Sequence, residues 1–422
     1  MKAIRGRLLS YRPAPRYEED GLVLVSGGKI SAVGPASDLL PHLPPDTPIE
    51  HHRGRLILPG FIDLHIHLPQ TKVIASYGAQ LMEWLERYTF VEEARYADPA
   101  VAESGARFFL DELFRNGTTT AVVYGSVHPQ SADALFSQAA SRGAAMIAGK
   151  VMMDRGAPEA LLDTAQSSYD HGKALIDRWH GKDRQLYAVT PRFAITSTPA
   201  QLDAARALLA EHPGVYLQTH LSENQAEIEL VRSLYPGAED YAGVYESFGL
   251  LGPRSLLGHC LHLSKREQRR IAESGAVAVL CPTSNLFLGS GLADRATLNG
   301  NGIRTGLATD VGGGTSYSML RTAAEAYKVE QLRGRPLPAH EAFRWITRGN
   351  AEALGMEDQI GSIEVGRYAD LVVLDSASTP AMAHRMERCE SLEEELFVLL
   401  TLGDDRAVAA TYVQGENVLP SA

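Results

Sequence analysis

Two histidines separated by one residue stand at the end of an apolar run, in the segment DLHIH at residues 63–67. Alternate side chains of a β-strand point to the same face, so His65 and His67 lie about 6.5–7 Å apart along the chain. At that separation two imidazoles can reach one metal ion at about 2.0–2.1 Å each. The alternative is a pair of polar residues on an exposed strand face. Because the flanking residues 56–58 and 61–62 are apolar, we predict a buried strand that ends in a metal site.

Three further apolar runs end in side chains that bind metals or transfer protons. Residues 215–220 end in His220, with Glu223 just beyond; residues 256–259 end in His259; residues 306–310 end in Asp310. A single buried histidine is more often a core residue than a ligand. Four strands that carry such residues at their carboxyl ends predict an active site, because (β/α)₈ barrels form their active sites at that rim.

Imidazole nitrogens with one carboxylate oxygen suit zinc, with iron(II) or cobalt as alternatives. We assign as ligands His65, His67, His220 and Asp310, which leaves a position for water. Metal binding lowers the pKa of such a water to about 7. Glu223 is then the group that takes a proton from the attacking water and passes it to the substrate. His259 orients the hydroxide or stabilises charge; a role as an extra ligand, to the same or a second metal, is the alternative.

A second metal on this scaffold usually requires a bridging carboxylated lysine on an inner strand. The strand expected at residues 186–193 contains no lysine, and Lys150 in the preceding strand is the one alternative. A structural role suits Lys150 better. We therefore predict one metal ion per chain.

The elements that must position these residues alternate between short apolar runs and longer segments of helical spacing. Several runs are almost continuously apolar, as in parallel strands that are covered on both faces. The expected strands are residues 61–67, 119–125, 144–151, 186–194, 215–220, 255–260, 276–281 and 303–310. Residues 199–212, with Thr198 as a cap, and residues 264–274 are clear helices. Eight strands with helices between them predict an α/β fold, a closed (β/α)₈ TIM-like barrel; an open doubly wound sheet is the alternative.

Both ends of the chain contain shorter strand-like pieces broken by glycine and proline. They are residues 21–26, 29–33, 371–374 and 408–413. We expect the two ends to pair into one small composite β-sandwich domain. The predicted domains are therefore 1–58 and 361–422 for the β domain and 59–360 for the catalytic barrel.

Composition limits the partners and the cellular setting. The 422 residues are 45% hydrophobic and 22% charged, as in a globular protein, and their net charge of −11 argues against binding nucleic acid or an anionic membrane. The three cysteines have no CxxC spacing, which argues against a disulfide framework and a cysteine zinc site. No segment looks like a signal peptide or a membrane span, so we expect a cytoplasmic protein.

A series of sequence blocks resembles the amidohydrolase superfamily and, within it, the guanine deaminases. The blocks include PGFIDLHIHLPQ, LMEWLERYTF, VTPRFAIT, THLSEN, CPTSNLFLGSG and TDVGGGTSYSML. The HxH motif with a later His and Asp is shared widely in this superfamily. The glutamine in HIHLPQ, the PRF tripeptide and the TDVGGG–YSML block are more particular to guanine deaminases. The resemblance implies zinc-dependent deamination of guanine to xanthine and ammonia, a composite β domain and a homodimer.

The same resemblance places substrate contacts at Gln70, Arg192 and Phe193. We include the metal ligand His220 and the proton carrier Glu223 among the substrate-binding residues. Guanine is planar and neutral, so its pocket needs stacking surfaces and directed polar groups. Phe193 and Trp84 offer aromatic faces, although core packing suits Trp84 almost as well. Gln70 donates and accepts hydrogen bonds, and Arg192 donates to purine O6 and N7.

Three other functions compete with this interpretation. A related deaminase would act on 8-oxoguanine, cytosine, a triazine or an adenosine derivative; Gln70 and Arg192 argue against it. A cyclic-amide hydrolase is disfavoured by the missing strand lysine. A non-catalytic scaffold protein would typically have lost the metal ligands.

The run Gly312–Gly314 lacks a phosphate-loop pattern, and close backbone approach beside Asp310 explains it better.

Overall fold

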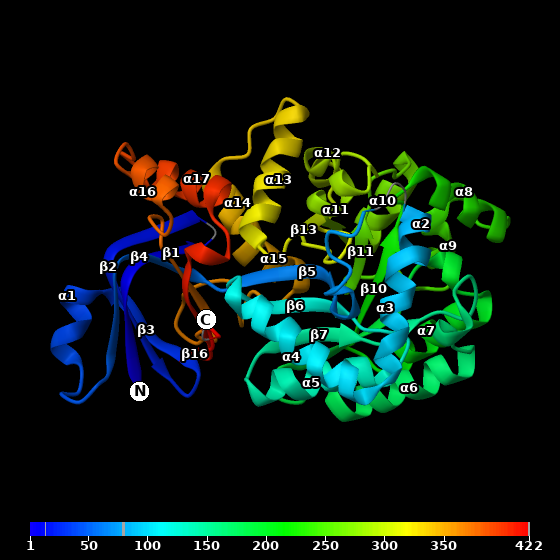
Figure 1. Cartoon of the computed structure of the whole chain (residues 1–422), viewed down its shortest axis with the longest axis horizontal. Helices are drawn as coiled ribbons and strands as arrows, with labels where there is room; N and C mark the ends of the chain where they lie inside the picture. The colour runs from blue at the N-terminus through cyan, green and yellow to red at the C-terminus, as the bar shows by residue number, and fades with distance from the viewer. Residues whose placement is uncertain (13, 78–80, 421–422) are drawn as a thin grey trace.

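The computed structural model describes residues 1–12, 14–77 and 81–420. A barrel of parallel strands surrounded by helices lies beside a smaller sheet that contains both termini (Figure 1). The predicted fold class is confirmed, and the alternative of an open doubly wound sheet is not.

Eight strands pair in parallel, in chain order, around the barrel. They are β5 (Phe61–His67), β6 (Thr118–Tyr124), β7 (Ala145–Gly149), β9 (Gln185–Pro191), β10 (Tyr216–Leu221), β11 (Ser255–His259), β12 (Val277–Leu280) and β13 (Arg304–Leu307). A two-residue strand, β8 (Val151–Met152), pairs with the end of β9. Most of their side chains are buried, as the continuous apolar runs indicated. The last strand ends earlier than expected, so Asp310 lies in the loop that follows β13, with a left-handed φ of 53°.

The barrel closes between its first and last strands through side chains as well as backbone. The Nδ2 atom of Asn350 donates to the carbonyls of Ile62 in β5 (2.7 Å) and Leu307 in β13 (2.8 Å). Its Oδ1 atom accepts from the Leu307 N–H at 2.9 Å. Nearer the rim, the buried Asp63 carboxylate accepts hydrogen bonds from the backbone N–H groups of His65 and Thr309.

Helices cover the outside of the barrel, and the helix expected from residue 199 begins at the capping residue that the sequence indicated. Thr198 caps this helix, α7 (Pro199–Glu211), and Ser264 caps α10 (Lys265–Ser274), each by accepting a bond from a backbone N–H of the first turn. The helices are α1 (Ala36–Leu39), α2 (Leu81–Trp84), α3 (Phe90–Ala94), α4 (Pro99–Arg115), α5 (Pro129–Ser141), α6 (Ala165–Trp179), α7 (Pro199–Glu211), α8 (Gln225–Leu234), α9 (Tyr241–Ser247), α10 (Lys265–Ser274), α11 (Pro282–Phe287), α12 (Arg295–Gly300), α13 (Met319–Leu332), α14 (Ala339–Arg344), α15 (Asn350–Leu354), α16 (Pro380–Met386) and α17 (Leu392–Leu402).

The small sheet joins the two ends of the chain in the order β16-β15-β14-β4-β1-β2-β3. Its strands are β1 (Lys2–Arg12), β2 (Ala14–Ser26), β3 (Lys29–Pro35), β4 (Ile49–Pro59), β14 (Leu371–Leu374), β15 (Val408–Val413) and β16 (Glu416–Asn417). Strand β4 links the two halves, because it pairs with β1 on one side and β14 on the other. The sheet formed by both termini is thus confirmed, whereas the limits 1–58, 59–360 and 361–422 stay a prediction.

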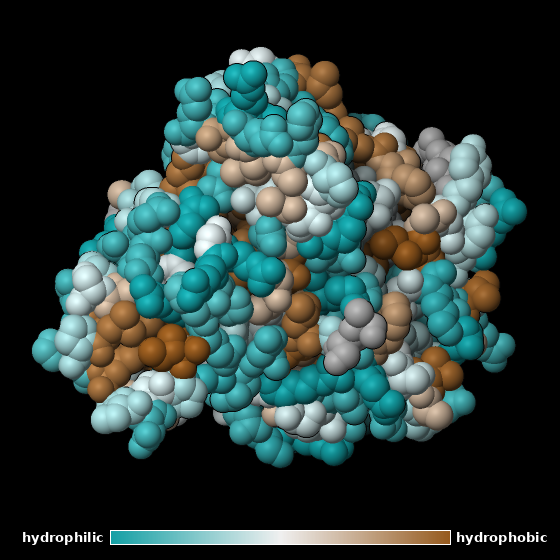
Figure 2. Space-filling model, turned by 60° about the vertical axis from the view of Figure 1, so that its left-hand side comes forward, coloured by the Kyte–Doolittle hydropathy of each residue, from teal (hydrophilic) through white to brown (hydrophobic). Residues whose placement is uncertain are grey.

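The face of the molecule seen in Figure 2 is mostly hydrophilic, with hydrophobic side chains in separate small groups. Large exposed apolar side chains of the chain include Leu332, Leu402 and Val365. Within the described ranges, no helix has both the length and the apolar character that a membrane crossing requires.

Replacing Asn350 with alanine should destabilise the barrel at its seam. The Leu307 N–H and the Ile62 carbonyl would lose their partner in the core, and an unpaired buried group costs about 1–3 kcal/mol. We expect a lower thermal midpoint by differential scanning calorimetry. The control is Asn301→Ala, which removes an exposed amide. Equal midpoints for the two variants would contradict the role of Asn350.

Candidate active site

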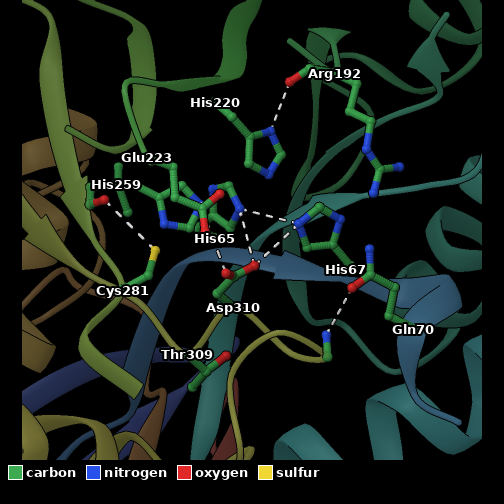
Figure 3. Close-up of polar contacts among 12 residues, drawn as sticks. His65, His67, Gln70, Arg192, His220, Glu223, His259, Cys281, Thr309 and Asp310 are labelled. Carbon is green, nitrogen blue, oxygen red and sulfur yellow. Dashed lines mark hydrogen bonds and ion pairs between the residues drawn. The ribbon is translucent and has the colours of Figure 1, made fainter. Parts of the chain in front are cut away.

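The predicted metal-binding residues converge at the carboxyl ends of the barrel strands. His65 and His67 come from β5, His220 from β10 and Asp310 from the loop after β13. All four are buried, with His220 the most exposed at 9%. Their side chains face a common point, with Glu223 and His259 beside them (Figure 3).

The distances between several of these side chains are short enough for their donor atoms to hold a metal ion together. The Nε2 atoms of His65 and His67 are 3.2 Å apart, and they lie 3.3 and 3.2 Å from Oδ1 of Asp310. Two triplets bring one donor atom from each residue within 4.8 Å of one another: His65, His67 and His220; and His65, His259 and Asp310. The strand alternation of the HxH motif therefore does bring the two imidazoles together.

The chemistry of the donor set fits a divalent metal. The Nδ1 atom of His220 lies 2.7 Å from the Arg192 carbonyl, an arrangement that leaves Nε2 as the free nitrogen toward the cluster. Burial lowers the pKa of all three histidines, that of His67 to about 3, so the imidazoles are neutral as ligands must be. Although burial alone would raise it, the imidazoles of His65 and His67 hold the pKa of Asp310 well below its usual range.

His259 sits between the metal-binding cluster and the predicted proton carrier. Its Nε2 atom is 3.4 Å from Oε2 of Glu223 and 3.8 Å from Oδ2 of Asp310. Its Nδ1 atom is held by Oδ1 of Asn285 at 2.9 Å. Both His259 and Asp310 have left-handed backbones, with φ of 70° and 53°, a conformation that costs about 1–3 kcal/mol per non-glycine residue. Strain of this kind is typical of residues that the fold holds in place for function.

Glu223 is buried at the edge of the cluster and is oriented from two sides. Its Oε1 atom accepts a hydrogen bond from the Ser290 hydroxyl at 3.1 Å, and its backbone N–H donates to Glu227 at 2.9 Å. Burial, together with the negative charge of Asp310, raises the pKa of Glu223 to about 8. A carboxyl group with such a pKa can both take and give a proton near neutral pH.

One pocket contains the predicted substrate contacts and most of the cluster. Gln70, Trp84, Arg192 and Phe193 line it together with His67, His220, Glu223, His259 and Asp310. Leu81, Leu85 and Leu288 supply apolar walls. All predicted site residues therefore lie in or beside one hollow, and their individual roles stay predictions.

Two further sequence interpretations can be compared with the structure. A Cβ atom at Gly314 would lie 1.8 Å from the Thr309 carbonyl, and one at Gly312 would lie 2.7 Å from the Gln70 carbonyl. Close backbone approach does account for these glycines. Lys150 is fully buried in an ion pair with Asp163, so its contacts are those of a structural lysine.

Several residues that shape this site were missed from the sequence. Asn285 and Ser290 hold His259 and Glu223. Both lie in the block CPTSNLFLGSG, which was noted without a role for either residue. Glu93 binds both Gln70 and Arg192, yet four glutamates stand between residues 83 and 93 and nothing in the sequence separates it from the others.

Comparison with known proteins agrees with this geometry. Residues 56–418 match the model of the Amidohydrolase family. The chain belongs to the amidohydrolase family. The resemblance inferred from the sequence blocks is therefore confirmed.

Relatives within this amidohydrolase family are similar over their full length. The guanine deaminase of Escherichia coli (strain K12) is 46% identical over 99% of this chain and 98% of its own. The solved structure of E. coli guanine deaminase has a TM-score of 0.97, with 99% of both chains covered. A guanine deaminase from C. acetobutylicum, solved with guanine bound in its active site, is 30% identical with a TM-score of 0.89, again over 99% of both chains.

Alanine substitutions should separate a metal ligand from the neighbouring histidine. We expect His67→Ala to lower the metal content from about one ion per chain to a small fraction, because the cluster loses a donor. His259→Ala should keep its metal. Inductively coupled plasma mass spectrometry on protein purified without chelator measures both. Equal loss from both variants would make His259 a ligand and contradict the assignment.

Proposed function

We propose that this amidohydrolase deaminates guanine hydrolytically to xanthine and ammonia, with one zinc ion per chain. The observation that carries the proposal is a single pocket in which a proton-carrying glutamate, a metal-binding cluster and a wall of hydrogen-bond donors meet. The 46% identity to a guanine deaminase over the whole chain supports the choice of ring.

The pocket offers guanine both stacking surfaces and directed donors. Phe193 and Trp84 are almost fully buried and present aromatic rings to the hollow. Arg192 can donate to O6 and N7 of the purine, and Gln70 lies beside it.

The chemistry proposed is addition of water to C2 of the purine, followed by loss of the amino group as ammonia. A divalent ion held by the cluster would lower the pKa of that water toward 7. Glu223 takes the proton of the attacking water and delivers it to a ring nitrogen, for which its pKa of about 8 is suited. His259, 3.4 Å from Glu223, stabilises the charge that develops on the attacking oxygen.

The competing functions are less well supported. A cyclic-amide hydrolase with two metals lacks its bridging lysine, since Lys150 is engaged by Asp163. A scaffold protein would not need a complete donor set with Glu223 beside it. A deaminase for another heterocycle would keep the metal chemistry and differ in the Gln70 and Arg192 contacts, which substrate comparison tests.

The proposal extends to zinc as the native ion, a homodimer and a cytoplasmic location. The nitrogen and oxygen donors suit zinc, with Fe²⁺ as the alternative. All three cysteines are unpaired, as expected in a reducing compartment. Light scattering coupled to size-exclusion chromatography measures the dimer.

Replacing Glu223 with glutamine should stop turnover but leave the metal in place. We expect kcat on guanine to fall about 10²–10⁴-fold, because proton transfer is lost while the donor cluster is intact. Ammonia release and the loss of guanine absorbance report turnover, and metal analysis is made on the same sample. A fully active Glu223→Gln enzyme would rule out the assigned role.

The wild-type enzyme should prefer guanine in a panel with 8-oxoguanine, adenine, cytosine and melamine. Preference for a different ring would overturn guanine as the proposed substrate.

Arg192→Ala should lower kcat/KM for guanine by about 10–100-fold, since a charged donor contributes about 1.5–3 kcal/mol. Unchanged kinetics of the variant would remove Arg192 from the site.

A further inference from the structure

A buried glutamate outside the predicted set connects the two polar residues of the pocket wall. Glu93 lies on α3 and is completely buried. Its carboxylate accepts hydrogen bonds from Nε2 of Gln70 at 2.9 Å and from Nη1 of Arg192 at 2.9 and 2.7 Å. The backbone carbonyl of Glu93 in turn accepts from the Ser126 hydroxyl at 2.9 Å, which anchors α3 to the loop after β6.

Glu93 determines which way the Gln70 amide points. The Oε1 atom of Gln70 accepts from the Gly312 N–H at 3.0 Å, while Nε2 donates to Glu93. A rotated amide would set its oxygen against the carboxylate and its NH₂ against an N–H, so both contacts would become repulsive. One N–H of Gln70 then remains free for a ligand.

Glu93 also decides which donors of Arg192 remain for the pocket. Both bonds to the carboxylate come from Nη1, so the N–H groups on Nε and Nη2 are not used by Glu93. The guanidinium is 3% exposed, and the carboxylate compensates its charge. The wall is therefore neutral overall and rich in donors, which suits the oxygen and nitrogen acceptors of an uncharged ring.

We infer that Glu93 is a positioning residue for substrate recognition: by holding Gln70 and Arg192, it presents their N–H groups to the O6 and N7 edge of guanine. This inference rests on the proposed function. Glu93 does not line the pocket and acts only through the two residues that do.

The test compares Glu93→Gln with wild type on guanine and on 2-aminopurine, which is guanine without O6. Glutamine retains the shape but replaces one carboxylate oxygen by an NH₂ group and removes the charge, so the three donated bonds can no longer all be accepted and Arg192 loses its ion pair. We expect KM for guanine to rise about 10-fold, the lower end of the loss expected from removing Arg192 itself, with a smaller change in kcat. The affinity for 2-aminopurine, measured as substrate or competitive inhibitor, should change much less.

Glu92→Gln is the matched control, because it removes the same charge one residue away. Glu92 pairs with Arg95 across the helix surface and does not touch the pocket residues. Its kinetics should equal those of wild type. Metal content and thermal midpoint are measured for every variant. If Glu93→Gln does not fold, Glu93→Asp replaces it, because aspartate keeps the charge opposite Arg192. Glu93→Asp should also raise KM for guanine, by a smaller factor than Glu93→Gln.

The outcomes separate the two proposals. A wild-type enzyme that turns over guanine, with a Glu93→Gln variant of unchanged KM, overturns the role of Glu93 alone. A loss that is equal for guanine and 2-aminopurine, or confined to kcat, also overturns it, because a purely structural defect would act in that way. A wild-type enzyme with no activity on guanine overturns the proposed function and this inference with it.

Discussion

The active site depends on how the barrel closes between its first and last strands. Among the described residues no strand ladder joins β5 to β13, and the seam is made by individual contacts. The Asp310 N–H donates to the His65 carbonyl and the His67 N–H donates to the Val311 carbonyl, both at 2.8 Å. These two bonds place the carboxylate from one side of the seam against the imidazoles from the other. The metal-binding geometry is therefore a consequence of barrel closure.

This closure is stabilised by buried polar groups, each of which is fully engaged. Asp63 accepts from the backbone of both sides of the seam, and its burial raises its pKa to about 6. Lower in the barrel, Asn350 donates to a backbone carbonyl on each side of the seam. Unpaired, such groups would each cost about 1–3 kcal/mol, so they specify one arrangement of β5 against β13. The left-handed backbone of Asp310 is tolerated because the seam over-determines its position.

Sequence patterns predicted the barrel well because its signals are local. Continuous apolar runs mark strands such as β7 and β12, and Thr198 marks a helix start by a bond within one turn. The histidines of the predicted metal site were singled out because each stands near the end of a recognisable strand, and Asp310 because it closely follows the apolar run of β13. Strands β1 and β4, which pair with each other, were missed. The first half of β4 contains the polar stretch EHHRGR, and only its pairing in the small sheet makes it a strand. That pairing joins residues far apart in the chain, which no local pattern records.

The same distinction explains why the pocket wall was only half predicted. Gln70 and Arg192 stand next to strand ends, where a polar side chain indicates a functional site. Glu93 lies on a short helix among other glutamates, and only the fold shows that it is buried while Glu92 lies in a surface pair with Arg95. A buried carboxylate with three bonds from two donors is costly to desolvate and is stable only with all of its partners present. The specificity of the pocket therefore depends on a hydrogen-bond network. In this network the Glu93 carboxylate, which lies outside the pocket, determines which N–H groups Gln70 and Arg192 can offer to a substrate.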